Sequence, residues 1–239
     1  MSEGDASMPA TPVHEDTSKA GSDFDCSAQA SPAWSSMPSS PAWAPLPRVI
    51  VDSDPARFDV GCPAGREGMC AHLAQHGFAI AAACATPDDV ASIASSLWDF
   101  LEHGTGGAVR RDDVNTWTGP HWLPDPANGI IAGYGIGQSV AMWRARTLPR
   151  VRDAFAAIWS THDLLSSFDG ANVFRPWQGR PEWRTQGGWY HVDQGIDKPG
   201  CHCVQGLLTL TDATYDSGGL VVVPGSHLRH DELCARHAH

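Results

Sequence analysis

The sequence predicts an α+β domain with a sandwich or jelly-roll core. Two observations lead to this fold class: helical patterns of apolar residues lie before residue 166, and short β-rich segments divided by Gly, Pro and Asp turns lie after it. The β-rich segments are too short and too close together to be βαβ units, which favours an antiparallel arrangement. The length of 239 residues and the 42% apolar content are sufficient for one domain with a full core.

Residues 1–47 form an acidic tail that we expect to be disordered. Seven of the chain's 18 prolines lie in it, together with six acidic residues, one Lys and many Ser and Ala residues. Such a segment buries too little apolar surface to offset the entropy of ordering it. The folded domain is therefore expected at residues 48–239.

The first half of this domain predicts a short helix, a strand and a longer helix. The short helix ends at Gly77, and an apolar strand follows at 78–84. Thr86 then caps a helix that begins at Pro87 and ends at Gly104. The apolar residues of this helix that recur on one face are Val90, Ile93, Leu97 and Leu101.

A second amphipathic helix is predicted from Pro149 to Leu165. The side chains expected to face the core are Val151, Phe155, Ile158 and Trp159. Residues 105–147, which lie between the two long helices, are rich in Gly, Asp and Trp and predict loops. The β-rich segments that follow occupy residues 170–176, 187–194, 202–213 and 218–226.

Composition excludes several classes of function. A formal net charge of −11 provides no basic face for phosphates, which argues against nucleic-acid binding. The seven cysteines are an odd number without the spacing of a disulfide framework, which favours reduced thiols. No signal peptide is recognisable, and the longest apolar run has eight residues, far below the roughly 20 that span a bilayer. We expect a cytoplasmic protein with no membrane partner, and the sequence leaves its oligomeric state open.

His191 and Asp193 form a His-x-Asp pair in the second β-rich segment. Alternate residues of a strand point to the same side, so the imidazole and the carboxylate can reach one cation. These groups are two of the three ligands in the two-His, one-carboxylate site of non-heme Fe(II) oxygenases. Without further context, a solvated or hydrogen-bonded pair on a strand explains the same two residues.

The wider context resembles a known family. The stretches SFDGANVFRPW, WYHVDQ and LLTLTDATYDSGGLVVVPGSH resemble the phytanoyl-CoA dioxygenase family of Fe(II)- and 2-oxoglutarate-dependent oxygenases, and the likeness extends over residues 70–230. The resemblance implies a double-stranded β-helix core of the jelly-roll or cupin kind, with packed N-terminal helices. It also implies that His191 and Asp193 are catalytic metal ligands for Fe(II), and that 2-oxoglutarate is the co-substrate, with ascorbate as an accessory reductant. The reaction implied is hydroxylation of an unactivated C–H bond in a small-molecule or acyl substrate.

His227, in the PGSH stretch, is the candidate third metal ligand, but its spacing argues against it. In the family four strands lie between the strand that carries His-x-Asp and the strand that carries the distal His, and four strands with their turns need about 40 residues or more. Only 33 residues lie between Asp193 and His227. The family's later distal His and its co-substrate Arg are not recognisable before His239. We therefore expect an incomplete β-helix that lacks its C-terminal strands, as in a fragment or a truncated gene product.

Several other residues have two interpretations. Arg175 is a candidate for binding the anionic co-substrate or for pairing with an acid such as Asp169, and Gln194 is a candidate hydrogen-bond donor beside Asp193. Arg236 has the spacing of the co-substrate Arg only if His227 is the distal ligand. Four further residues have the chemistry of zinc ligands: Cys201, Cys203, Cys234 and His237. The alternative is that their thiols are small structural residues of the core. The alternative function is a non-catalytic binding or scaffold protein on a degenerate dioxygenase fold.

Overall fold

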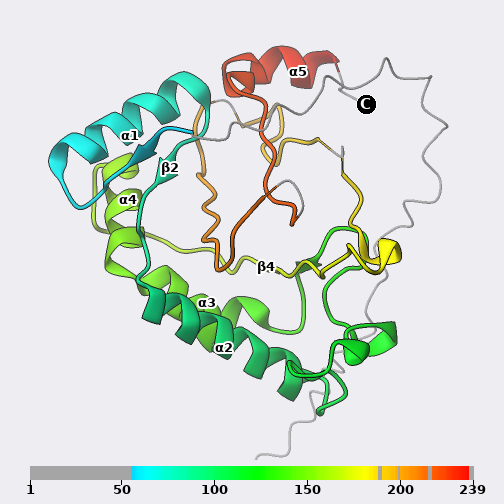
Figure 1. Ribbon diagram of the computed structural model, residues 1–239. Helices are drawn as coiled ribbons and strands as arrows, with labels where there is room; N and C mark the ends of the chain where they lie inside the picture. The colour runs from blue at the N-terminus through cyan, green and yellow to red at the C-terminus, as the bar shows by residue number, and fades with distance from the viewer. Residues whose placement is uncertain (1–54, 188–189, 199, 215–216, 237–239) are drawn as a thin grey trace, which may run out of the picture. The chain divides into compact units, whose positions relative to one another are not determined.

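The computed structural model describes residues 55–187, 190–198, 200–214 and 217–236 (Figure 1). All of these residues belong to one compact unit, Pro47–His239. The predicted tail at residues 1–47 and the expected start of the domain at residue 48 lie outside the described residues.

The first described elements form a strand, a helix and a second strand. Helix α1, Pro63–His76, begins where the Cys62 thiol accepts a hydrogen bond from Gly65 N–H, and it ends at Gly77. Gly77 has a φ of 80°, a left-handed conformation that favours glycine, so the predicted stop signal is confirmed. Strands β1 (Arg57–Phe58) and β2 (Ile80–Ala81) pair in parallel on either side of α1 in the sequence, and β2 is shorter than the predicted strand at 78–84.

Helix α2, Pro87–Gly104, has the predicted bounds. The Thr86 hydroxyl accepts a hydrogen bond from Asp89 N–H, and the Asp89 carboxylate accepts one from Thr86 N–H, which completes a capping box. Ile93 and Leu101 on the predicted apolar face are buried. The sequence therefore predicted both the ends and the orientation of this helix.

Residues 105–147 contain more structure than the predicted loops. Strand β3 (Ile130–Ile131) pairs antiparallel with β4 (Ala171–Asn172), and helix α3 occupies Val140–Thr147. Ser139 caps α3 through a hydrogen bond from Met142 N–H to its hydroxyl. The prediction of loops was wrong for these elements because α3, with only eight residues, is too short to show a clear helical period in the sequence.

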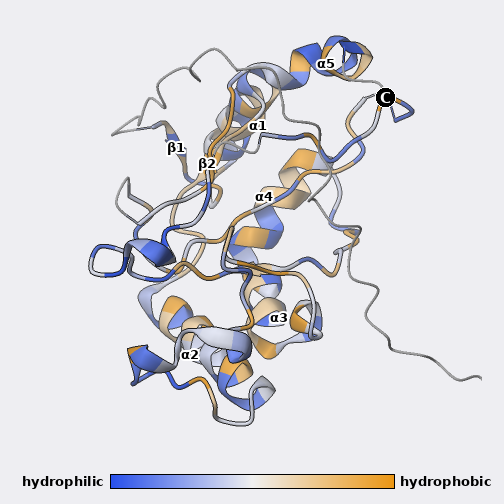
Figure 2. Cartoon of the chain, turned by 90° about the vertical axis from the view of Figure 1, so that its right-hand side faces the viewer, coloured by the Kyte–Doolittle hydropathy of each residue, from blue (hydrophilic) through white to orange (hydrophobic). Residues whose placement is uncertain are grey.

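Helix α4 occupies Pro149–Trp159 and is shorter than the predicted helix that ended at Leu165. It stops at Ser160, whose φ of 53° is left-handed. Apolar and polar stretches alternate along α4 (Figure 2). Trp159, the last residue of α4, was predicted to face the core but is 37% exposed.

The helices pack through three small apolar clusters. One joins α1 to α4 through Val60, Met69 and Ala154. A second joins α2 to α3 through Ile93, Ala141 and Leu148, and Leu208 and Leu210 from the third β-rich segment pack against it. The third contains Leu101, Ile131 and Ile136. The third β-rich segment is thus held on the helical layer by side-chain contacts.

The jelly-roll core is not confirmed by the described residues, in which the named strands form two sheets of two strands each. Of the predicted β-rich segments, only 170–176 contains a strand, and the described parts of the other three have none. A β-rich segment becomes a strand only when a neighbouring backbone pairs with it, because ladder hydrogen bonds come from both strands. The fourth segment accordingly leaves its apolar side chains, Leu220, Val221, Val222 and Val223, exposed.

Candidate functional site

His191 and Asp193 lie close together in a segment without regular secondary structure that leads into a turn. The His191 Nε2 atom lies 3.3 Å from the Asp193 Oδ1 atom. Their side chains are 54% and 53% exposed, so a solute or an ion can reach both. The predicted convergence of the imidazole and the carboxylate is therefore present, although the described part of this segment is not a strand.

The second oxygen of Asp193 has a partner that the sequence did not predict. The Gln205 side-chain amide donates a hydrogen bond from Nε2 to Asp193 Oδ2 at 2.5 Å. Each carboxylate oxygen thus has a different neighbour, since Oδ1 faces His191 and Oδ2 faces Gln205. A Gln twelve residues from an Asp gives no sequence signal unless the turn between them is known.

Gln194, the predicted hydrogen-bond donor beside Asp193, instead organises the turn that follows. Its Nε2 donates to the carbonyl oxygens of Lys198 and Gly200, and its Oε1 accepts from His202 N–H at 3.3 Å. Its backbone carbonyl accepts a hydrogen bond of 2.7 Å from His230 Nε2, and this bond raises the pKa of His230. The Gln194 amide therefore fixes the loop after the candidate site.

His227 lies at the end of α1. Its Nε2 donates to the Ala74 carbonyl oxygen at 2.9 Å, and its ring covers Gly77, where an added Cβ would come within 2.4 Å of Nδ1. The neighbouring Gly225 N–H donates to the His76 carbonyl oxygen at 2.8 Å. This contact satisfies a free carbonyl at the end of α1 and agrees with a structural role for His227.

In the part of the chain that the structure describes, no group of three or more His, Cys, Asp or Glu side chains lies close enough to hold a metal ion. His227 therefore does not join His191 and Asp193 there. The thiols of the alternative zinc set are also separate: Cys201 Sγ contacts the Cys203 carbonyl oxygen, and Cys234 Sγ lies 3.4 Å from His230 Nε2. His237, the fourth member of that set, lies outside the described residues.

Arg175 is buried in a cluster of tryptophans. Its guanidinium lies 5.5 Å from the centre of the Trp122 ring and 4.9 Å from that of Trp183, and it donates to the Trp117 carbonyl oxygen at 2.9 Å. Burial lowers the pKa of Arg175. Asp169, one of its two predicted partners, is not among these contacts, and the Asp169 carboxylate accepts a hydrogen bond from Gly170 N–H.

Comparison with known proteins decides the family of this region. Residues 133–239 match the family described as Phytanoyl-CoA dioxygenase (PhyH). This part of the chain is a PhyH family domain. His191, Asp193, Gln205 and Arg175 all lie within it, so the resemblance predicted from the sequence is confirmed at the level of the family.

A curated protein that this chain resembles is "Ava biosynthesis cluster protein O" from Aspergillus versicolor. The two are 40% identical over 114 residues, which is 48% of this chain. The matched region covers 36% of the relative's length. No solved structure matches this chain.

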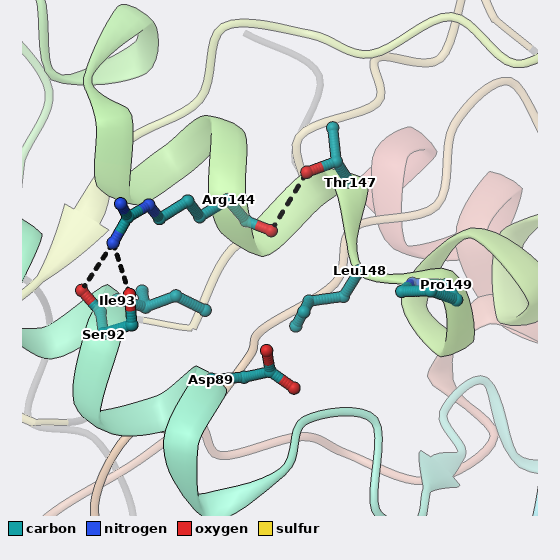
Figure 3. A pocket seen from close by; sticks show the side chains of 7 residues that line it. All are labelled: Asp89, Ser92, Ile93, Arg144, Thr147, Leu148 and Pro149. Atoms are coloured by element: carbon teal, nitrogen blue, oxygen red, sulfur yellow. Dashed lines mark hydrogen bonds between the residues drawn. The ribbon is translucent and has the colours of Figure 1, made fainter.

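Two open cavities lie beside or within the PhyH domain. One, of about 280 Å³, lies between α2 and the α3–α4 junction, where Arg144 donates to the Ser92 carbonyl oxygen and hydroxyl (Figure 3). The other, of about 550 Å³, is lined by Trp122, Leu123, Pro124, Asp125, Pro126, Asn128, Ile130, Ala132 and Tyr134. Tyr134 is 71% exposed and has a left-handed φ of 59°.

Membrane insertion through a helix has no support in the described residues, since none of their helices combines the length and the apolar character that a crossing requires.

Proposed function

We propose that the PhyH domain belongs to an Fe(II)- and 2-oxoglutarate-dependent oxygenase in which His191 and Asp193 are metal ligands. The observation that carries this proposal is the 3.3 Å approach of His191 Nε2 to Asp193 Oδ1 inside the segment that matches the family. The family suggests the reaction class, and the convergence of an imidazole with a carboxylate supplies two of the three ligands of a facial triad.

The geometry of the pair fits one edge of an octahedral metal site. Two ligand atoms that each lie about 2.1 Å from a metal, at a right angle, are about 3.0 Å apart. The 3.3 Å separation of Nε2 and Oδ1 is close to this value. In such a site His191 contributes a neutral lone pair, and Asp193 contributes a negative charge that offsets part of the charge of the cation.

Bound Fe(II) and 2-oxoglutarate would supply the oxidation of an unactivated C–H bond by dioxygen. The residues of this chain would bind and orient the metal, and the exposure of both side chains leaves its remaining positions open to the co-substrate and oxygen. The co-substrate role of Arg175 remains a prediction, and its contacts with Trp117, Trp122 and Trp183 compete with that role.

The substrate we propose is a small molecule of a biosynthetic pathway. The relative from Aspergillus versicolor carries the name of a biosynthesis cluster, which favours this class over a macromolecule. An acyl substrate remains within the same proposal because both classes offer unactivated C–H bonds.

The proposal is tested by uncoupled turnover of 2-oxoglutarate. Purified protein with Fe(II), ascorbate as the reductant and carboxyl-labelled 2-oxoglutarate should release labelled carbon dioxide above the blank without any prime substrate. The His191→Ala variant should release no more than the blank. Equal release from the two proteins, or none from either, would contradict the proposal for this chain.

A non-catalytic binding or scaffold protein is the second candidate. Two observations favour it: in the described residues no third metal-binding side chain joins His191 and Asp193, and the guanidinium of Arg175 is enclosed by tryptophans. Under this alternative the carbon dioxide release stays at the blank level for the wild-type protein as well.

A further inference from the structure

We propose that Gln205 is a positioning residue that sets the orientation of the Asp193 carboxylate for metal binding. This inference rests on the proposed metal site and adds a residue to it. The hydrogen bond from Gln205 Nε2 to Asp193 Oδ2, at 2.5 Å, carries the inference.

The contact determines which carboxylate oxygen faces the imidazole. A free Asp side chain can rotate about its χ2 bond and exchange the places of its two oxygens. When Gln205 binds Oδ2, the other oxygen, Oδ1, stays 3.3 Å from His191 Nε2. The pair of donor atoms is thereby arranged before a cation arrives, which lowers the entropy lost on binding.

An amide suits this role better than a charged donor. A Lys or Arg at position 205 would compete with the metal for the negative charge of Asp193, because each forms a charge-assisted hydrogen bond to a carboxylate. The neutral amide orients the carboxylate and leaves its charge for the cation. Hydrogen-bond partners of metal ligands act in this way in other proteins, and their loss typically costs about 10- to 100-fold in metal affinity.

The position of Gln205 is itself supported from the helical layer. Leu208 and Leu210, farther along the same segment, pack on the α2–α3 cluster. Gly206 lies against the ring of Phe155 in α4, where an added Cβ would come within 2.9 Å of the ring. The Gln205 side chain is exposed, so its replacement should leave these packing contacts in place.

The test measures metal binding by the full chain without turnover. Co(II) serves as the probe because its visible absorption reports the geometry of its ligands, and its dissociation constant is obtained by titration. We expect Gln205→Leu to weaken Co(II) binding by about 10- to 100-fold and to change the absorption spectrum. The midpoint of thermal unfolding without metal should equal that of the wild type. The matched control, Gln75→Leu on the exposed side of α1, should bind Co(II) as the wild type does.

The outcomes separate this inference from the proposed function. If the wild type binds Co(II), His191→Ala does not, and Gln205→Leu binds as tightly as the wild type with the same spectrum, the role of Gln205 is wrong and the proposed metal site stands. If the wild type and His191→Ala bind Co(II) equally, the metal site itself is wrong, and the role of Gln205 is lost with it.

Discussion

At the scale of single residues, Arg175 shows how a charged side chain is held inside this protein. Its guanidinium is almost fully buried, and its partners are the faces of two indole rings and a backbone carbonyl oxygen. Indole faces attract cations through their quadrupole, and a desolvated contact of this kind contributes up to about 2 kcal/mol. Arg175, which follows β4, therefore connects its own segment to Trp117 and Trp122, which precede it, and to Trp183, which comes after it.

Replacing Arg175 tests this structural role. We expect Arg175→Ala to lower the free energy of unfolding by about 2–3 kcal/mol, because the cation–π contacts, the hydrogen bond and the packing of the side chain are lost together. Urea denaturation measures the change. Arg229→Ala is the matched control, and it should change the free energy of unfolding much less, since the Arg229–Glu232 pair is largely exposed and screened by solvent. Equal losses from the two variants would contradict the role given to Arg175.

The ion pair between Glu102 and Arg111 makes the stability of the fold depend on pH. Hydrogen bonds from Arg111 hold the pKa of Glu102 at about 2, below its ordinary value. The lowered pKa means that this contact stabilises the fold above the ordinary carboxyl pKa and loses its effect as the pH falls toward about 2. We expect Glu102→Gln to reduce stability at pH 7 and to flatten its decline below pH of about 4.3. Denaturation at a series of pH values, at low and high salt, measures this, and an unchanged pH profile would contradict it.

At the scale of the elements, the start of α2 depends on its capping box. Thr86→Ala should destabilise the protein by about 1 kcal/mol, because Asp89 N–H loses the hydroxyl that accepts its hydrogen bond. Thr86→Ser keeps this hydroxyl and should remain close to the wild type. The midpoints of thermal unfolding of the three proteins provide the comparison, and an equal loss from Ser and Ala would show that packing of the Thr methyl group matters instead.

A buried leucine and an exposed leucine should contribute very differently to the free energy of unfolding. Leu101 in α2 is 1% exposed, and Leu220 in the fourth β-rich segment is 72% exposed. Leu101→Ala should cost about 2–5 kcal/mol because it leaves a cavity beside Ile131 and Ile136. Leu220→Ala should change the free energy of unfolding by less than about 0.5 kcal/mol. Urea denaturation distinguishes the two, and a large loss from Leu220→Ala would mean that this segment packs more tightly than its exposure indicates.

At the scale of the whole molecule, the sequence predicted the features that depend on residues close together in the chain, such as the ends of helices. The ends of α2 follow from Thr86, Pro87 and Gly104, and the end of α1 follows from Gly77, since caps and stops act within a few residues. The β-rich segments could not be resolved in this way. Whether Leu220 and its neighbours join a strand depends on pairing with another backbone segment, which is often distant in the sequence, and propensity does not specify that partner.

The residues of the candidate site also differ in whether their contacts could be predicted from local sequence. The convergence of His191 and Asp193 was predicted from their spacing of two residues, and their role as metal ligands was predicted only from the resemblance to the family. Gln205 was not predicted, since its approach to Asp193 depends on the turn that Gln194 organises. The partner of Arg175 could not be predicted from the sequence, because a guanidinium binds both carboxylates and the faces of indole rings.

The missing side chain at Gly206 has one more effect. Since only hydrogen atoms lie on that α-carbon, the chain rests directly on the Phe155 ring, one residue from the amide that holds Asp193. Helix α4 thus supports the segment whose Gln205 side chain binds the Asp193 carboxylate. A change in the packing of the Phe155 ring against Gly206 should therefore alter the affinity of the proposed metal site for a cation, although Phe155 has no atom that binds a metal.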